Sequence, residues 1–284
     1  KTDKITKNNG TRTDLQALDR RMQRYPTLIY DGPFSEHLEK TEPRALSGQA
    51  EVDREESKNR ALAFVDKRPD LEYRAALTGD TNGRIPAYRV EVSAGEGNAG
   101  NKTLLDLTRQ GGRVIWLLQS RLPGGQVISI DEARQKAVQF LKDRGFEDMR
   151  PTYFMQQENT VTFNFAATQD DVILYPDLVK VTVALDNGEV VGAETTGYLM
   201  SHRQRDLPKE RISQEQARAT INPRLEVTGG KLALIPVGAS DERLTYEFQG
   251  RLGDETFLIY VNAQNGREEN VLKLIETENG TLTM

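Results

Sequence analysis

Hydrophobic and polar residues follow a pattern that recurs along the chain. Two segments, Ile128–Gly145 and Ile212–Ile221, share the pattern I-S-x-[DE]-x-A-R. In each, a serine stands at the start and Glu or Gln follows three residues later, which predicts a helix that begins with a capping box. Apolar residues recur at helical spacing after Ser129, and Gly145 follows them. The first segment is therefore predicted to be an amphipathic helix that ends at this glycine.

Two further helices are predicted upstream. Asp53–Arg68 has an acidic first turn followed by apolar residues, as in the repeated helices. Asp14–Arg24 places three apolar residues on one stripe, and Pro26 ends that pattern.

Alternating segments follow each of the last three helices and predict antiparallel strands joined by hairpins. The predicted strands are Leu71–Leu77, Ala87–Ser93, Thr103–Thr108 and Arg113–Gln119; Thr152–Gln157, Thr160–Ala167, Leu178–Leu185 and Glu189–Thr196; and Lys231–Val237, Leu244–Gly250, Thr256–Asn262 and Glu269–Ile275. Asn187-Gly188 and Asn265-Gly266 predict type I′ turns in the closing hairpins of the second and third sets. The predicted fold class is α+β, with tandem small units that each pack an N-terminal helix on an antiparallel four-stranded meander.

The repeats divide the chain into four predicted regions. Residues 1–50 form an N-terminal helix and an ordered linker, residues 51–125 the first unit, residues 126–207 the second and residues 208–284 the third. A chain of 284 residues is long enough for several small cores. Arg121–Gly125 and His202–Pro208 are the predicted linkers that set the angles between units.

Composition narrows the possible functions. The net charge of −5 gives no basic footprint, so no nucleic-acid partner is predicted. The chain holds no cysteine, which excludes disulfides and thiolate chemistry. No apolar run approaches the roughly 20 residues that cross a bilayer. Because the chain begins at Lys1 without a signal-like stretch, we expect a fragment, with any targeting or anchoring segment upstream of it.

No catalytic, cofactor-binding or metal-binding residues are predicted, and no cofactor is expected. Gly95–Gly100 matches G-x-G-x-x-G, but a predicted strand follows it where a dinucleotide site requires a helix. His37 and His202 do not lie at metal-ligand spacing, and His202 is expected to be solvated in a polar linker. Asp170-Asp171 is expected to be loop charge. A pair of hydrolase carboxylates that meet only in space is the alternative.

The closing hairpins resemble those of PepSY domains. They carry V-x-V-x-x-x-x-G-x-V in "VTVALDNGEV" (Val181–Val190) and a related pattern in "IYVNAQNGRE" (Ile259–Glu268). Directly before such units, "RYPTLIYDGPFSEHLEKTEPRAL" (Arg24–Leu46) resembles the YpeB family of spore germination proteins. This second resemblance covers essentially the whole chain.

The YpeB resemblance implies a non-enzymatic role. It implies that the chain binds and stabilises the cortex-lytic enzyme SleB, a peptidoglycan transglycosylase, and restrains it until germination. It also implies an extracytoplasmic location near the spore inner membrane and cortex, with membrane contact only through an anchor upstream of Lys1. The alternatives are a propeptide-like protease inhibitor and a hydrolase with an unrecognised carboxylate pair. A binding role predicts that the contact uses strand edges, such as Glu269–Ile275, or grooves between units.

Overall fold

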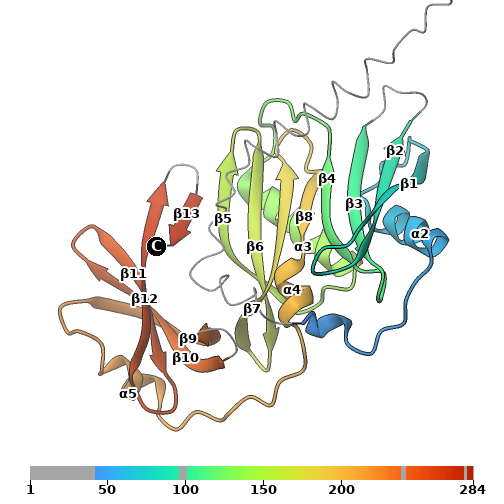
Figure 1. Cartoon of the computed structure of the whole chain (residues 1–284). Coiled ribbons are helices and arrows are strands. Elements are labelled where there is room, and N and C mark those ends of the chain that lie inside the picture. The colour runs from blue at the N-terminus through green and yellow to red at the C-terminus, as the bar shows by residue number, and fades with distance from the viewer. Residues whose placement is uncertain (1–41, 96–100, 238–240, 278–279, 284) are drawn as a thin grey trace, which may run out of the picture. The chain divides into compact units, whose positions relative to one another are not determined.

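The computed structural model describes residues 42–95, 101–237, 241–277 and 280–283 of the chain. These residues form three successive groups, each a helix followed by antiparallel strands (Figure 1). The first group contains α2 (Arg54–Phe64), β1 (Tyr73–Thr81), β2 (Ala87–Ala94), β3 (Lys102–Thr108) and β4 (Val114–Gln119). The second contains α3 (Ile130–Asp143), β5 (Met149–Gln157), β6 (Thr160–Gln169), β7 (Val172–Ala184) and β8 (Val190–Glu194). The third contains α5 (Gln214–Arg218), β9 (Glu226–Val237), β10 (Asp241–Leu252), β11 (Glu255–Asn262), β12 (Glu268–Thr277) and β13 (Gly280–Thr283).

The helix-first groups confirm the predicted α+β class, and each predicted strand overlaps an observed one. Two short helices were not predicted, η2 (Arg44–Leu46) and α4 (Thr196–Ser201). The predicted helix at Asp14–Arg24 lies outside the described residues. The limits of the four predicted regions, at residues 50, 125 and 207, stay a prediction.

The described strands join in one sheet in the order β1-β2-β3-β4-β8-β7-β6-β5-β13-β12-β11-β10-β9. β4 connects the first two groups by pairing antiparallel with β8 at Trp116–Leu118. β7 also pairs in parallel with β9, at Ile173 and Leu174. The meanders are therefore joined by pairing between their strands. The sequence pattern within a single meander gives no sign of this pairing.

Helices α2 and α3 cover the same face of the strands of the first two groups. Ala61 of α2 and Phe140 of α3 belong to one buried cluster with Leu105 of β3 and Phe163 of β6. A second buried cluster holds Ala217 of α5 with residues of β7, β9, β10 and β11. The first cluster thus brings the two longer helices side by side, and their neighbouring ends form the site described below.

Both predicted capping boxes form, at Ser129 and Ser213. The residue before each serine donates its backbone N–H to a carbonyl of the hairpin that closes the same group. These hydrogen bonds run from Ile128 to Leu185 (2.9 Å) and from Ile212 to Ala263 (3.2 Å). The start of each helix is therefore fixed to the turn of its own closing hairpin, which explains why helix and hairpin recur together.

The predicted type I′ turns at the Asn-Gly pairs are wrong. Such a turn needs positive φ at both central residues, but only the glycines have it, at +79° for Gly188 and +73° for Gly266. Each glycine N–H instead donates to the carbonyl four residues earlier, over 2.9 Å, which closes a longer turn beside an irregularity in the ladder. Positive φ at two successive residues occurs at Asp170-Asp171, the two-residue turn between β6 and β7.

Asp186 fixes the Arg121–Gly125 linker to the closing hairpin of the second group. Its carboxylate accepts hydrogen bonds from the guanidinium of Arg121 (2.6 Å) and from the backbone N–H of Gly124 (2.6 Å). The hydrogen bond from Arg121 is the main cause that holds the pKa of Asp186 below its usual value.

Asp186→Asn is expected to make the stability of the protein less sensitive to acid. A carboxylate with a lowered folded-state pKa stabilises the fold above its unfolded pKa, about 3.9, and this contribution is lost as the pH falls through the folded pKa. The wild type should therefore lose stability below about pH 4, and the variant, less stable at neutral pH, should lose less. Urea unfolding at several pH values measures both slopes, and parallel slopes would contradict the role of Asp186.

Candidate partner-binding groove

The residues singled out in the sequence do not come together in a catalytic arrangement within the described part of the chain. Strand β3 begins at Lys102, so the G-x-G-x-x-G segment is followed by a strand, as expected. Asp170-Asp171 forms a hairpin turn. His37 and the end of the glycine segment lie outside the described residues. No group of three or more His, Asp or Glu that could hold a metal ion occurs among the residues described.

The expectation of a solvated His202 is wrong. Its ring stacks on that of Tyr198, with centroids 4.1 Å apart, and its Nδ1 lies 2.8 Å from the carboxylate of Asp177. Because Asp177 belongs to β7, the linker after α4 is bonded to the sheet and does not run freely through solvent. The polar composition of the linker suggested exposure, but these polar groups bond to one another.

The strand edge predicted at Glu269–Ile275 is also different from expectation. β12 pairs with β11 on one side and, over its last four residues, with β13 on the other. Lys273 pairs with Glu255 while the flanking Leu272 and Leu274 pack into a buried cluster, as the alternation of side chains along a strand requires. Within the predicted edge β13 covers only Leu274 and Ile275, and the use of the remaining residues for strand addition stays a prediction.

The predicted alternative, a groove between units, is present where α2 and α3 end side by side. The rings of Phe64 and Phe140 meet edge to face, with centroids 5.5 Å apart. Arg144, the C-cap of α3, donates hydrogen bonds to the carbonyls of both phenylalanines, and its guanidinium lies 3.6 Å from the centroid of the Phe140 ring. One arginine therefore joins the C-terminal ends of two helices whose last carbonyls have no partner within their own helix.

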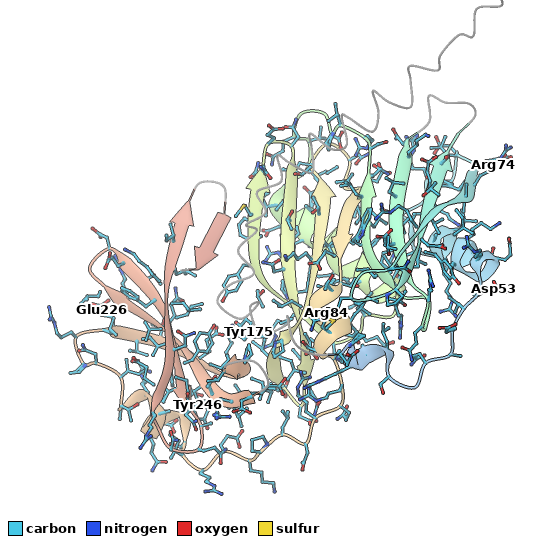
Figure 2. The ribbon with its side chains drawn as sticks, viewed as in Figure 1. Asp53, Arg74, Arg84, Tyr175, Glu226 and Tyr246 are labelled. Carbon is cyan, nitrogen blue, oxygen red and sulfur yellow. The ribbon has the colours of Figure 1, made fainter. Side chains whose placement is uncertain are left out.

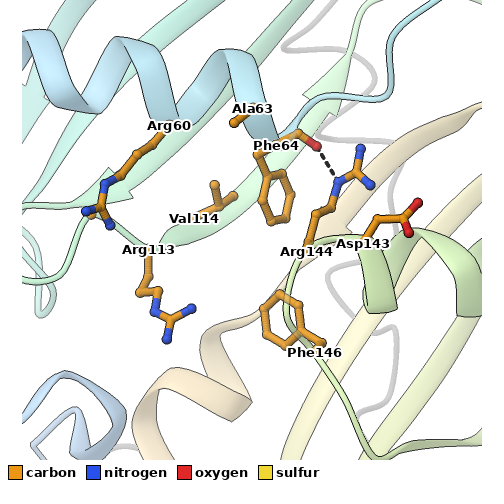
Figure 3. Close-up of a pocket in the computed structure, with 9 residues that line it drawn as sticks. Arg60, Ala63, Phe64, Arg113, Val114, Asp143, Arg144 and Phe146 are labelled. Atoms are coloured by element: carbon orange, nitrogen blue, oxygen red, sulfur yellow. Dashed lines mark hydrogen bonds between the residues drawn. The ribbon is translucent and has the colours of Figure 1, made fainter.

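Two adjoining cavities open along this junction, of about 270 and 290 Å³, and they share Asp143 and Arg144 as lining residues. Figure 3 shows the first cavity, bordered by the rings of Phe64 and Phe146 and by side chains from α2, α3 and the start of β4. We refer to the two cavities together, with all the residues that line either of them, as the α2–α3 groove. Its floor is apolar and its rim is charged.

The charge of the α2–α3 groove is opposite in sign to that of the whole chain. Six basic and three acidic residues line it, whereas the chain has a net charge of −5. The basic residues are Arg60, Lys67, Arg68, Arg113, Lys136 and Arg144, and the acidic residues are Asp66, Asp143 and Glu189. The groove therefore favours an acidic binding partner.

Several of these basic side chains are available to a partner. Arg60 pairs with Glu56, and Arg68 pairs with Asp70. The other four, Lys67, Arg113, Lys136 and Arg144, form no ion pair with any residue that the structure describes. Burial lowers the pKa of Arg144. Asp66 and Asp143 act on this cation through space but form no ion pair with it, so an incoming anion would stabilise it further.

No residue of this groove was predicted from the sequence to bind a partner. The Phe64 and Phe140 positions were identified as apolar helix positions, and Gly145 as the end of α3, but Arg144 carries no distinguishing pattern. The groove exists because β4 pairs with β8, which places α2 and α3 on one face. That pairing joins segments far apart in the sequence.

None of the described helices is long and apolar enough to cross a membrane.

The repeated helix-and-meander groups define a tandem PepSY-type α+β protein. Family models agree. Residues 11–208 match the model described as YpeB sporulation, PepSY1 and PepSY2 domains. Residues 211–272 match the model described as peptidase propeptide and YPEB domain. The chain belongs to the YpeB family of sporulation proteins.

Individual relatives support this assignment. The chain is 38% identical over 244 residues to the sporulation protein YpeB of Halalkalibacterium halodurans, and this alignment covers 86% of this chain and 53% of that protein. It is 36% identical over 176 residues to the protein of the same name from Bacillus subtilis, covering 61% of this chain and 39% of that protein. The chain thus spans about half the length of these relatives or less. Among solved structures, the Bacillus megaterium YpeB C-terminal domain superimposes with a TM-score of 0.69 at 32% identity, covering 80% of this chain and 99% of that one.

Proposed function

We propose that this chain is a non-enzymatic germination protein that binds and stabilises the cortex-lytic enzyme SleB, restrains it until germination, and contacts it through the α2–α3 groove. Its place of action would be extracytoplasmic, near the inner membrane and cortex of the spore. The observation that carries the proposal is the groove, a basic surface with an aromatic floor on an acidic chain.

The composition of the groove suits a protein partner. Arginine and aromatic residues are enriched at the energetically dominant positions of protein interfaces. Phe64, Phe146 and Arg144 lie together here, and the exposed Lys67 and Lys136 stand at the rim. Basic rim residues accelerate association with an acidic partner, and apolar contacts at the floor then prolong the bound state.

The test is the affinity of the whole 284-residue chain for the purified enzyme, measured by biolayer interferometry. The double variant Lys67→Glu/Lys136→Glu reverses two rim charges and should weaken binding by at least about tenfold, since like charges across an interface oppose association. The matched control is Arg74→Glu. Arg74 lies in β1, its side chain is 82% exposed, and it extends outward at the periphery of the molecule (Figure 2). Its neighbours Tyr73 and Ala75 pack against the cluster that holds the helices, so strand alternation places Arg74 on the other face of β1.

Four outcomes separate the functional classes. Binding that is lost in the double variant but kept in Arg74→Glu, together with slower release of peptidoglycan fragments by the bound enzyme, supports the proposal. Equal binding by all three proteins would show that the groove is not the contact surface. No binding by the wild type would show that the enzyme is not the partner. Release of fragments by the chain alone would favour a hydrolase.

The second candidate is a propeptide-like inhibitor of a peptidase. It is favoured by the match of residues 211–272 to a model that describes peptidase propeptides. In that case the chain should inhibit casein cleavage by an extracellular bacterial peptidase and leave the lytic enzyme unaffected. The same protein preparations, assayed for both activities, distinguish a peptidase inhibitor from a protein that binds the lytic enzyme.

A further inference from the structure

Arginines from three separate elements line the first cavity of the α2–α3 groove. Arg60 comes from α2, Arg113 from the residue before β4, and Arg144 from the end of α3 (Figure 3). The apolar part of the wall consists of Ala63, Phe64, Val114 and Phe146. Asp143 is the acidic residue of this lining, so the cavity carries three basic side chains and one carboxylate and is positive on balance.

The three arginines differ in how their charges are satisfied. Arg60 bonds to Glu56 (2.7 Å) and to the carbonyl of Gly111 (2.7 Å), so it is held in place by the protein itself. Arg144 bonds only to main-chain carbonyls, and Arg113 is exposed and has neither a hydrogen bond nor an ion pair from its side chain to a described residue. Two arginines therefore line the cavity without a carboxylate bonded to either.

The backbone beside the cavity is shaped to hold this arrangement. Gly112 has φ of +57°, and a Cβ atom at this position would come within 2.7 Å of the Arg60 side chain. The absence of a side chain lets Arg60 reach the carbonyl of Gly111, and it keeps the turn before Arg113 tight. The position of the Arg113 backbone relative to Arg60 is thereby set before any ligand arrives.

We propose that this cavity binds a carboxylate flanked by a large apolar or aromatic group, presented by a segment of the protein partner. Arg113 would take the carboxylate, for which a planar guanidinium is the best-matched side chain. Phe64, Val114 and Phe146 would take the apolar group. The volume of about 270 Å³ is below the usual range of sites for whole small molecules, and it suits one or two side chains of a partner.

This inference deepens the proposed function and rests on it for the identity of the partner, but the cavity can be tested without that partner. Benzoate supplies a carboxylate on an aromatic ring, and benzamide supplies the same ring without the charge. Titration of the isotope-labelled 284-residue chain, followed by NMR, should show saturable shifts at Ala63, Phe64 and Val114 with benzoate. Benzamide at the same concentrations should cause little change.

Arg113→Gln removes the exposed charge and should raise the dissociation constant for benzoate about tenfold, while Arg74→Gln should leave it unchanged. Equal binding of benzamide, shifts confined to other regions, or equal affinity of Arg113→Gln and the wild type would each overturn the proposal. So would a total lack of benzoate shifts at tens of millimolar.

Binding measurements with the lytic enzyme then separate this inference from the proposed function. Arg113→Gln should weaken binding of the lytic enzyme, and benzoate should compete with the enzyme where benzamide does not. If the enzyme binds with an affinity that Arg113→Gln and benzoate leave unchanged, while Lys67→Glu/Lys136→Glu abolishes it, the groove binds the enzyme but the carboxylate site is wrong. If the enzyme does not bind and benzoate does, the partner is wrong and the carboxylate site stands.

Discussion

Replacing Asp177 with alanine is expected to lower the free energy of unfolding by about 3 kcal/mol, because the change leaves the buried Arg205 with only part of its counter-charge. The Asp177 side chain is fully buried in β7, and that of Arg205 is 3% exposed. The Arg205 guanidinium donates to both Asp177 oxygens (2.8 and 2.7 Å) and to the carboxylate of Glu242 in β10. Glu242 remains in the variant, so the expected loss lies at the low end of the range for a broken buried pair.

This cluster connects three elements that are distant in the sequence. Burial alone would lower the pKa of Arg205, but its hydrogen bonds to Asp177 and Glu242 raise it above the ordinary value, so the guanidinium stays charged at any accessible pH. The side chain of Gln169 also exchanges two hydrogen bonds with the backbone of Arg205 (3.0 and 2.7 Å). The linker at His202–Pro208 is therefore fastened to both β7 and β10.

An exposed ion pair provides the control. Arg54 and Asp80 lie 2.6 Å apart, with side chains 58% and 31% exposed, so Asp80→Ala should change stability by less than about 1 kcal/mol. Urea unfolding followed by circular dichroism compares the two variants with the wild type. Equal midpoints for Asp177→Ala and Asp80→Ala would show that the buried cluster does not stabilise the fold.

The helices and strands were predictable because their signals are local. The capping boxes at Ser129 and Ser213 and the alternating strands depend on residues that are neighbours in the sequence, and the structure confirms them. The consecutive apolar residues of Thr256–Asn262 indicated a strand buried on both sides, and Leu258–Asn262 are all buried. Helix and hairpin positions follow from such patterns without knowledge of the rest of the chain.

The first half of β7 was missed because its sequence contains features that oppose a strand. Pro176 has no N–H to give to a ladder, and the preceding Asp170-Asp171 suggested a loop. The structure accommodates the proline by an irregularity: Ala167 pairs with Leu174 and Ala166 with Leu178, which leaves the residues between them outside the ladder. Two of these residues, Tyr175 and Asp177, make buried contacts with β10 or the linker, so the irregular segment carries the junction of the second and third groups.

The α2–α3 groove was predictable only as a category. Repeated units imply that grooves lie between them, but the choice of groove depends on which meander edges pair. The pairing of β4 with β8 is set by side-chain packing across the whole sheet and by short connections, none of which leaves a local pattern. The charges at Arg113 and Arg144 are ordinary in the sequence and become distinctive only when that pairing places both in the lining of one cavity.

Gly188→Val is expected to lower the free energy of unfolding by about 1–3 kcal/mol and to lower the thermal midpoint of the second group measurably. Gly188 has φ of +79°, a conformation that a β-branched residue adopts only under strain. A Cβ atom at this position would also lie 3.3 Å from side-chain carbons of both Ile128 and Lys136, which is closer than ordinary contact. The strain therefore acts where the hairpin turn holds the start of α3.

Gly188→Asn is the matched control, because asparagine tolerates positive φ better than other residues with side chains, so it should cost less than valine. Melting curves of the wild type and both variants, followed by circular dichroism, give the order directly. A valine variant that melts with the wild type would show that the backbone at Gly188 is not in the left-handed region. An asparagine variant as unstable as the valine variant would instead assign the loss to crowding against Ile128 and Lys136. Since Lys136 also lines the groove, that outcome would predict weaker binding of the partner by both variants.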